Sequence, residues 1–225
     1  MITSKPVVLI TDFDGTISKR DFFWFAIDEY LHPEDIQPWT DYKQGKITLI
    51  EALSRIFAKI RVDEEDFHKF ILTLPIEKHF EDTVRYCTEN NIPIHIVSAG
   101  ADYYIKYILN HMNLLPFVKL LSNESYYSKE EGLKFKSPDK NSPYYLEDFG
   151  ISKKSIVEEY KNKGYFCIYA GDGTPDFEAA KLADVVFARE SLKKLCDKAG
   201  IENHHLHSYS DILNYLKENK LSNNQ

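Results

Sequence analysis

The chain has 225 residues, 43% of them hydrophobic and 14% aromatic, which is enough for one large domain or one domain with a smaller insert. A net charge of −7 argues against a nucleic-acid-binding surface. The three cysteines have no paired spacing, and no apolar run approaches the roughly 20 residues of a membrane-spanning helix. We therefore expect a cytoplasmic protein without a nucleic-acid or membrane partner, and composition leaves its oligomeric state open.

A short apolar run, Val7–Ile10, precedes two aspartates near the start of the chain. Such β-branched runs are typical of strands buried on both faces, and the carboxyl ends of these strands border the crevice where open α/β sheets bind ligands. Asp12 and Asp14 would repel each other there unless a cation such as Mg²⁺ lay beside them. An Asp-Gly turn whose carboxylates cap loop amides produces the same pattern, and both readings stay open at this point.

The next residues have helical spacing and predict several short helices. One begins near Asp21, and another begins after Thr48, which has capping-box spacing to the glutamate three residues on. This block is too long for a single crossover. We therefore expect a small helical domain at residues 18–75 above the carboxyl edge of a sheet, with residues 1–17 and 76–225 forming the core domain.

Strands and helices alternate through the rest of the chain. This order predicts an α/β fold, with a mainly parallel Rossmann-like sheet and helices on both faces. Strands are expected at residues 93–97, 117–121, 165–169 and 185–188, helices at 77–91, 102–113, 152–163, 175–183, 192–199 and 211–218, and a hairpin within 122–151.

Polar residues follow two of these later strands. Ser98-Ala99-Gly100 offers a hydroxyl and backbone N–H groups to an anion, although this tripeptide is also typical of an ordinary turn. Asp172 adds a third acidic residue at a strand end, as a magnesium site requires. Asp176 is expected in the first turn of a helix, and the favourable interaction of an acidic side chain with the helix dipole is enough to account for an aspartate there. Lys153 opposes the dipole of its own helix, which indicates either a role elsewhere or a solvated side chain.

Taken in chain order, these motifs resemble those of the haloacid dehalogenase superfamily of phosphohydrolases. The resemblance extends over nearly the whole chain, is greatest to the phosphoserine-phosphatase-like branch, and includes similarity to the methylthioribulose-salvage phosphatases. The insert resembles the C1-type cap of that superfamily. Unlike the salvage phosphatases, the chain has no cysteine-rich segment before the motif lysine. The matching motifs are Asp12-Phe13-Asp14-Gly15-Thr16, Ser98-Ala99-Gly100, Lys153, and Gly171-Asp172 with Asp176.

The resemblance implies a magnesium-dependent phosphomonoesterase for a small organic phosphate. Asp12 would form an aspartyl-phosphate, and Asp14 would act as general acid and then general base, which requires a raised pKa. The resemblance also implies magnesium ligation by Asp12, the Asp14 backbone and Asp172, phosphate binding by Ser98, Ala99, Gly100 and Lys153, support from Thr16 and Asp176, and substrate contacts from Asp21 and Arg55.

Two alternatives use the same residues. A phosphotransferase or phosphomutase needs both Asp12 and Asp14, so these residues do not separate it from a hydrolase. A non-catalytic phosphate-binding module needs no nucleophile, which makes Asp12 superfluous. A dehalogenase is disfavoured because its reaction has no alkoxide to protonate. The histidine-rich run at residues 204–207 has no carboxylate cluster and is expected to be a surface or strand-edge segment.

Overall fold

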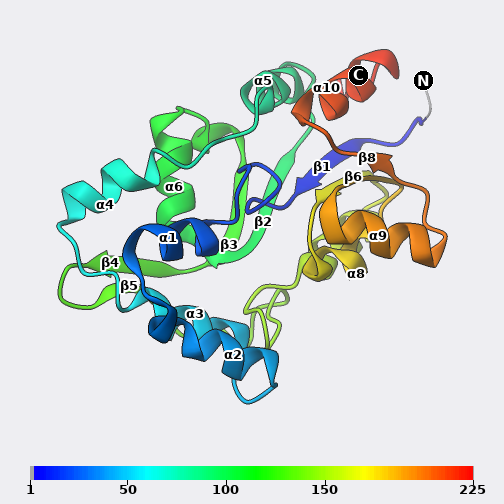
Figure 1. The fold of residues 1–225 in the computed structure, drawn as a ribbon. Coiled ribbons are helices and arrows are strands. Elements are labelled where there is room, and N and C mark those ends of the chain that lie inside the picture. The colour runs from blue at the N-terminus through cyan, green and yellow to red at the C-terminus, as the bar shows by residue number, and fades with distance from the viewer. Residues whose placement is uncertain (1–2, 225) are drawn as a thin grey trace.

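A computed structural model describes residues 3–224 and has a six-stranded parallel sheet at its centre (Figure 1). The strands are β1 Val7–Thr11, β2 Ile94–Ala101, β3 Lys119–Asn123, β6 Phe166–Gly171, β7 Val185–Ala188 and β8 His204–His205. Their order is β3-β2-β1-β6-β7-β8, so the chain adds strands on one side of β1 and then on the other. The reversal between β1 and β6 is the switch point at which open α/β sheets bind ligands.

Alternate residues of the central strands face two different layers of helices. On β1, Val7 and Leu9 pack into one hydrophobic cluster, whereas Val8 and Ile10 pack into the other. The predicted fold class, a mainly parallel sheet with helices on both faces, is therefore confirmed. The covering helices are α5 Phe80–Glu89, α6 Asp102–His111 and α10 Tyr209–Glu218 on one face, and α7 Lys153–Asn162, α8 Phe177–Ala180 and α9 Glu190–Ala199 on the other.

Four short helices and a 3-10 turn at residues 33–36 form the insert between β1 and α5. Asp21 caps the first helix by accepting a hydrogen bond from the Phe23 N–H at 2.8 Å. Thr48 caps the third through the Glu51 N–H at 3.2 Å, as the sequence spacing predicts. The helices are α1 Phe22–Tyr30, α2 Gln37–Lys43, α3 Leu49–Phe57 and α4 Glu64–Ile71.

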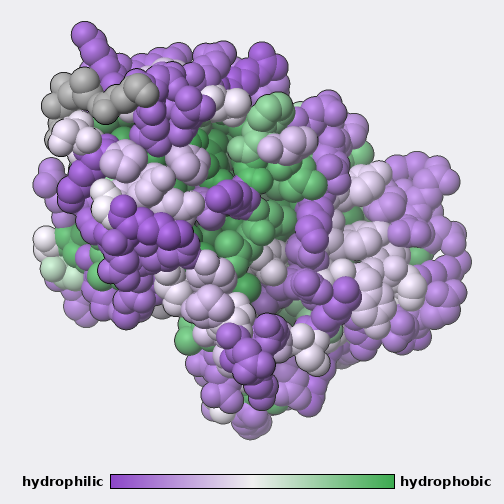
Figure 2. Space-filling model, turned by 180° about the vertical axis from the view of Figure 1, so that it is seen from behind, coloured by the Kyte–Doolittle hydropathy of each residue, from purple (hydrophilic) through white to green (hydrophobic). Residues whose placement is uncertain are grey.

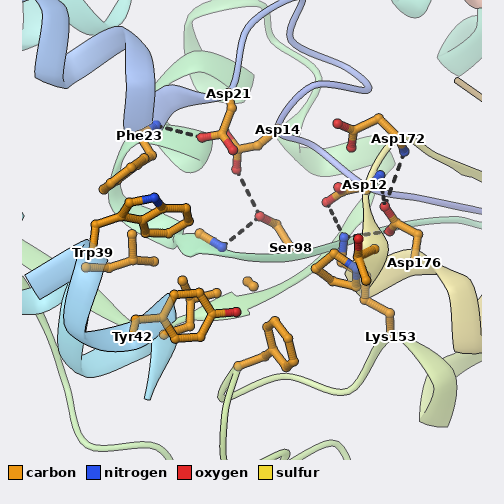
Figure 3. A pocket seen from close by; sticks show the side chains of 18 of the residues that line it. Asp12, Asp14, Asp21, Phe23, Trp39, Tyr42, Ser98, Lys153, Asp172 and Asp176 are labelled. Carbon is orange, nitrogen blue, oxygen red and sulfur yellow. Dashed lines mark hydrogen bonds and ion pairs between the residues drawn. The ribbon is translucent and has the colours of Figure 1, made fainter. Parts of the chain in front are cut away.

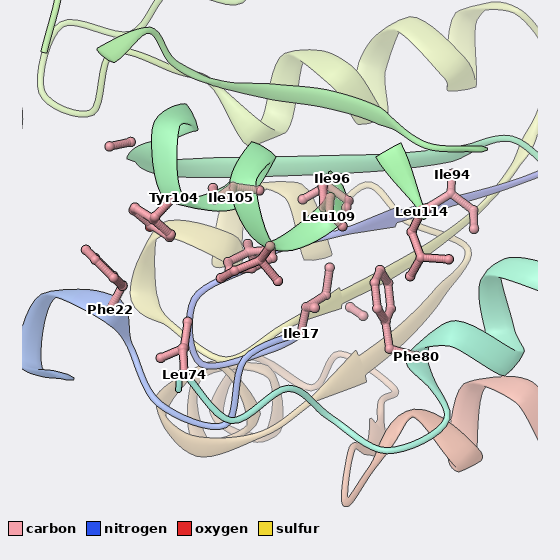
Figure 4. Close-up of a cluster of buried hydrophobic side chains, with 14 of the residues drawn as sticks. Ile17, Phe22, Leu74, Phe80, Ile94, Ile96, Tyr104, Ile105, Leu109 and Leu114 are labelled. Atoms are coloured by element: carbon pink, nitrogen blue, oxygen red, sulfur yellow. The ribbon is translucent and has the colours of Figure 1, made fainter. Parts of the chain in front are cut away.

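The larger hydrophobic cluster continues from the sheet into this insert. Figure 4 shows Phe22 of α1 beside Tyr104 of α6, with Ile17 and Leu74 from the two connecting segments nearby. The rings of Phe22 and Tyr104 stack with centroids 3.9 Å apart and an interplanar angle of 11°. The start of the insert is thus packed directly on the core domain.

The two segments that connect the insert to the sheet pair with each other. Ser18 and Ile76 form an antiparallel bridge. Arg189, immediately before α9, contacts the Glu77 carboxylate at 2.8 Å and the Thr16 carbonyl at 2.6 Å through its guanidinium group. One side chain from the sheet therefore holds both connecting segments.

Replacing Arg189 with methionine is expected to lower the free energy of unfolding by about 3 kcal/mol. Glu77 would lose its cationic partner at a site where only 5% of its side chain is exposed. Urea unfolding measures this loss, and the Arg189→Met/Glu77→Gln double variant should recover part of it. An unchanged midpoint in the single variant would show that the ion pair does not stabilise the fold.

The predicted hairpin consists of β4 (Ser125–Ser128) and β5 (Gly132–Phe135), and it packs against the insert. Gly132 has φ +73°, and a Cβ there would lie 2.6 Å from the last carbonyl oxygen of α3. Glycine therefore permits the close approach of hairpin and helix. The Tyr127 hydroxyl also donates to the Val62 carbonyl at 2.7 Å. The hairpin, which the predicted boundaries assign to the core domain, thus supports the insert.

β2 extends four residues beyond its predicted end, further than the other strands extend beyond theirs. β2 does not end at Val97 but continues through Ser98-Ala99-Gly100, and Ala101 pairs with Asn123 of β3. The pairing changes register between Val97 and Ala101, so the tripeptide forms an irregularity inside the strand. The Asn123 side chain donates to the Ala99 carbonyl at 2.8 Å, which replaces part of the lost ladder.

The rear face of the molecule is mostly hydrophilic, with hydrophobic residues gathered in a band across its centre (Figure 2). Between residues 3 and 224, no helix is both long and apolar enough to cross a bilayer. Cys87, Cys167 and Cys196 are buried and unpaired, as expected. The exposed His204-His205 pair forms the edge strand β8.

Candidate active site

A cavity of about 340 Å³ lies at the carboxyl ends of β1, β2 and β6, and residues of α1, α2 and α3 form its opposite wall (Figure 3). Its position is the one that the parallel strand order requires for a ligand site. Most of the predicted site residues line it: Asp12, Asp14, Asp21, Ser98, Ala99, Gly100, Lys153, Asp172 and Asp176.

Lys153 contacts two of the carboxylates that were predicted to lie in the site. Its Nζ lies 2.8 Å from Asp12 Oδ1 and 2.7 Å from Asp176 Oδ1, and only 6% of its side chain is exposed. Lys153 is the first residue of α7, where the helix dipole disfavours a cation. The two carboxylates offset this cost, which explains why a buried lysine is stable at that position.

Asp176 is fully buried and orders the loop after β6. Its Oδ2 accepts hydrogen bonds from the N–H groups of Asp172 at 3.2 Å and Gly173 at 2.8 Å. Its Oδ1 also accepts a hydrogen bond from the Tyr169 hydroxyl at 2.6 Å. Asp176 therefore acts as a support for Asp172. The sequence analysis did not identify Tyr169, whose only signal is a hydroxyl within an otherwise apolar strand.

Asp172 lies against the loop that follows β1. Thr16 Oγ1 donates to its Oδ1 at 3.3 Å, so Thr16 contacts the site as a supporting residue. Gly15 has φ +74°, and a Cβ at this position would lie 2.4 Å from Asp172 Oδ2. The Asp-Gly-Thr sequence is therefore needed both for the turn and for the space that Asp172 occupies.

Asp14 is held by three donors from different elements. Its Oδ1 accepts from the Phe22 N–H at 3.2 Å, and its Oδ2 accepts from Ser98 Oγ at 3.1 Å and from the Tyr104 hydroxyl at 2.5 Å. Ser98 Oγ in turn accepts from the Gly100 N–H at 2.9 Å. Tyr104 was not identified from the sequence, because its place on the apolar face of α6 is typical of a core residue.

Burial and crowded negative charge raise the pKa values of these carboxyls. Burial raises the pKa of Asp12 well above its ordinary value; Lys153 opposes this, while Asp176 and Asp172 add to it. The pKa of Asp172 rises to about 7 through burial and then through the charge of Asp176. Burial also raises the pKa of Asp14, as a general acid requires. For Lys153, Asp12 and Asp176 outweigh the effect of burial and raise the pKa.

The site fits a hard divalent cation. Ligand atoms of Asp12, Asp172 and Asp176 lie within 4.8 Å of one another. Both Asp176 oxygens accept hydrogen bonds, whereas no donor among residues 3–224 is bonded to Asp12 Oδ2 or Asp172 Oδ2. Among residues 3–224, Lys153 is the only basic side chain that forms an ion pair with any of these carboxylates, and it pairs with Asp12 and Asp176. Oxygen ligands with uncompensated negative charge are what Mg²⁺ takes in proteins.

The opposite end of the cavity is largely aromatic. Phe23, Trp39 and Tyr42 line it together with apolar residues of α3. Asp21 lies at the boundary with the polar end (Figure 3), and burial followed by the charge of Asp14 raises its pKa to about 7. The cavity thus combines an acidic end with an apolar wall.

Arg55 does not reach this cavity. It lies on the solvent face of α3, where its guanidinium contacts Glu51 one turn earlier at 2.5 Å, and 54% of its side chain is exposed. The buried face of α3 carries Leu53 and Ile56 instead. Helical periodicity therefore places Arg55 away from the wall on which the sequence analysis expected it.

The chain belongs to the haloacid dehalogenase-like hydrolase family, which its residues 9–181 match. It is 28% identical over 219 residues to the 2-hydroxy-3-keto-5-methylthiopentenyl-1-phosphate phosphatase of Lysinibacillus sphaericus, a similarity that covers 95% of each chain. The phosphatase of the same name from Bacillus cereus is 28% identical over 213 residues, covering 94% of this chain and 96% of its own. The predicted family is confirmed, and these relatives support the predicted enzyme class, a phosphoric monoester hydrolase.

Solved structures show the same fold. A substrate-bound phosphoserine phosphatase complex matches with a TM-score of 0.66 and 18% identity, covering 95% of this chain and 99% of that chain. A phospho-aspartyl intermediate analogue of phosphoserine phosphatase matches with a TM-score of 0.65 and 19% identity, covering 94% and 99% of the two chains. The predicted likeness to the phosphoserine-phosphatase branch therefore holds at the level of the fold.

Proposed function

We propose that this protein is a magnesium-dependent phosphomonoesterase that hydrolyses a small organic phosphate through an aspartyl-phosphate on Asp12. The observation that carries the proposal is the contact of one buried ammonium group, Lys153 Nζ, with Asp12 at 2.8 Å and with Asp176 at 2.7 Å. This contact supports the proposed roles of Asp12 as nucleophile, Lys153 as the cation that neutralises phosphate and Asp176 as the support of a metal-binding loop. Family membership is consistent with this assignment.

The reaction uses the two aspartates after β1 in sequence. An Asp12 oxygen attacks phosphorus while the bond from phosphorus to the ester oxygen breaks, and Asp14 gives its proton to that oxygen. Asp14, now a carboxylate, takes a proton from the water that attacks phosphorus, and the bond between Asp12 and phosphorus breaks. Inorganic phosphate leaves, and both carboxyl groups return to their starting states.

The remaining residues bind and neutralise the phosphoryl group. Lys153, the Ser98 hydroxyl and the N–H groups of Ala99 and Gly100 are proposed to donate to its oxygens as charge develops. Asp12, Asp172 and the Asp14 carbonyl would hold Mg²⁺. When bound, Mg²⁺ would offset the negative charge of the Asp12 carboxylate and of the phosphoryl group.

We further propose that the insert, residues 18–75, acts as a cap and selects the leaving group. Its wall of the cavity is aromatic at Phe23, Trp39 and Tyr42, which suits a phosphate ester with an apolar body. The 2-hydroxy-3-keto-5-methylthiopentenyl-1-phosphate named for the relatives is a small ester and is the first candidate. Asp21, at the boundary, would accept a hydrogen bond from a polar group of the substrate.

A phosphate-release assay tests the proposed function. The panel contains 2-hydroxy-3-keto-5-methylthiopentenyl-1-phosphate, phosphoserine, phosphocholine, pyridoxal phosphate and a sugar phosphate, with Mg²⁺ present and water as the only acceptor. We expect free phosphate from at least one ester and none above background from Asp12→Asn. Turnover that needs an added alcohol would favour a phosphotransferase. Equal background release by both proteins from every ester would refute the phosphatase.

Magnesium is expected to stabilise the folded protein, and to do so more at about pH 8 than at about pH 5. Asp172 has a pKa of about 7 in the folded protein against an ordinary value of 3.8. Between these values the folded state holds a proton that the unfolded state has lost, so the stability of the metal-free protein falls as the pH rises. Mg²⁺ binds the ionised carboxylates and opposes that fall.

Thermal unfolding with and without Mg²⁺ at both pH values measures this effect. Asp172→Asn is the matched variant, because it removes the buried charge and a proposed ligand together. Its unfolding temperature should depend less on Mg²⁺ than that of the wild type. A wild-type unfolding temperature that Mg²⁺ leaves unchanged at about pH 8 would count against the metal site.

A further inference from the structure

The Tyr104 hydroxyl contacts the Asp14 carboxyl group inside the candidate active site. Tyr104 lies on α6, only 1% of the residue is exposed, and its hydroxyl is 2.5 Å from Asp14 Oδ2. A phenol has one O–H hydrogen to donate, and 2.5 Å is within the hydrogen-bond range for two oxygen atoms. Its contact is therefore a hydrogen bond to a carboxyl oxygen.

Gly100 and Phe22 both constrain the position of the Tyr104 side chain. A Cβ added at Gly100 would lie 2.0 Å from the Tyr104 hydroxyl and 2.7 Å from Asp14 Oδ2, so a side chain at Gly100 would displace one or both. Phe22 stacks on the Tyr104 ring and also gives its own N–H to Asp14 Oδ1 at 3.2 Å. The ring is thus fixed from the insert side, and the hydroxyl is fixed from the β2 side.

Ser98 cannot hold Asp14 throughout the proposed reaction. Its Oγ donates to Asp14 Oδ2 at 3.1 Å in the structure, but a hydroxyl has only one hydrogen to donate. When that hydrogen turns to a phosphoryl oxygen, Tyr104 is the remaining side-chain donor among residues 3–224 that bonds to Asp14. Among residues 3–224, the Tyr104 hydroxyl has Asp14 as its hydrogen-bond partner, and the proposed reaction assigns it no contact with phosphate.

We propose that Tyr104 is a positioning residue that fixes the Asp14 carboxyl and stabilises its ionised form after proton transfer. The proposal rests on the phosphatase function and specifies how its acid–base residue is controlled. When Asp14 gives its proton to the ester oxygen, it becomes a carboxylate in a buried site. A phenol O–H donor to that carboxylate forms a charge-assisted hydrogen bond, which is stronger than the bond to the neutral acid.

The effect of Tyr104 must then depend on the leaving group. A phenolate leaving group with a high pKa needs the Asp14 proton when its bond to phosphorus breaks, whereas a 4-nitrophenolate leaves without much help. Phenyl phosphate and 4-nitrophenyl phosphate differ little in shape, so the aromatic wall of the cavity should treat them alike. The value of kcat/KM reports steps up to formation of the aspartyl-phosphate, so it excludes the later hydrolysis.

Tyr104→Phe is the variant that tests this role. It keeps the ring that stacks on Phe22 and removes only the hydroxyl. Tyr103→Phe is the matched control, since the Tyr103 hydroxyl bonds to Glu64 and His68 of α4, each at 2.7 Å, and does not contact Asp14. Both variants lose one phenol from neighbouring positions of the same helix.

For Tyr104→Phe, kcat/KM for phenyl phosphate is expected to fall about 10- to 100-fold, and kcat/KM for 4-nitrophenyl phosphate by less than about threefold. Tyr103→Phe should change both values by less than about threefold. An equal fall with both esters would reduce Tyr104 to a structural role, and no fall with either would remove it from the reaction. If wild-type protein releases phosphate from neither ester nor from the panel above, the phosphatase function fails first.

Discussion

Asp12→Asn is expected to lower kcat by at least about 10⁴-fold with every phosphate ester that the protein turns over. The asparagine amide has nearly the size of the carboxyl group but is not a nucleophile toward phosphorus, so the aspartyl-phosphate cannot form. Its oxygen can still accept from the Phe13 N–H, which donates to Asp12 Oδ1 at 2.7 Å. Lys153 keeps its contact with Asp176.

The same substitution should leave the fold intact. Burial of the Asp12 charge raises its pKa, so a neutral amide removes an unfavourable charge from the metal-free protein. The unfolding temperature without Mg²⁺ should therefore equal or exceed that of the wild type. Asp28→Asn, an equal change of charge on the surface, is the control for both activity and stability. Asp12→Asn protein that keeps wild-type kcat would exclude Asp12 as nucleophile.

Asp14→Asn is expected to lower kcat about 10²- to 10⁴-fold, because an amide can neither give nor take the proton in the two steps. Asp14→Asn should slow hydrolysis of the aspartyl-phosphate more than its formation when the leaving group is 4-nitrophenolate. With 4-nitrophenyl phosphate the first step needs little acid catalysis, whereas hydrolysis of the aspartyl-phosphate still needs a base. The variant should therefore release nitrophenol in a rapid burst and then turn over slowly.

Stopped-flow absorbance measures that burst. Its amplitude should approach one nitrophenol per active site in Asp14→Asn. A linear time course from the first turnover, with kcat/KM for 4-nitrophenyl phosphate reduced as much as kcat, would instead place the effect of Asp14 in the first step. That result would also revise the role given to Tyr104, since Tyr104 acts through Asp14.

The parts of the site that sequence reasoning located are those that local patterns determine. An apolar run that ends in Asp12, and a second that ends before Asp172, have to converge once both strands are parallel neighbours. Lys153 was assigned to the site by the family resemblance, because its conflict with the helix dipole left a solvated side chain open; the structure supplies the two carboxylates that resolve this conflict. The capping residues Asp21 and Thr48 are likewise local signals.

The parts that were missed depend on contacts between distant segments. Tyr104 and Tyr169 have the spacing of core residues, and their hydroxyl groups gain a role only where Asp14 and Asp176 meet them. The irregularity at residues 98–100 requires the continued pairing of β2 with β3, which no local pattern predicts. Arg55 was assigned to the site by the family resemblance alone, and the helical register of α3 places it on the exposed face instead.

The packing of the insert bears on how a substrate enters. Arg189 holds both connecting segments, the Phe22 ring stacks on α6, and the β4–β5 hairpin supports α3 from the side. These contacts anchor α1, the end of α3 and the two segments that connect the insert to the sheet. In contrast, α2 contributes the aromatic residues Trp39 and Tyr42 to the cavity and contacts mainly α3. Of the insert helices that line the cavity, α2 is therefore the one that none of these contacts anchors.

Peptide mapping of phosphate trapped on the protein tests the central claim most directly. Asp14→Asn protein is mixed with 4-nitrophenyl phosphate and Mg²⁺, quenched in acid during the slow phase and digested for mass spectrometry. We predict phosphate on the peptide that contains Asp12, and none on that peptide when Asp12 is also replaced by asparagine. Steady release of nitrophenol with phosphate on a different residue, or on no residue, would contradict the account.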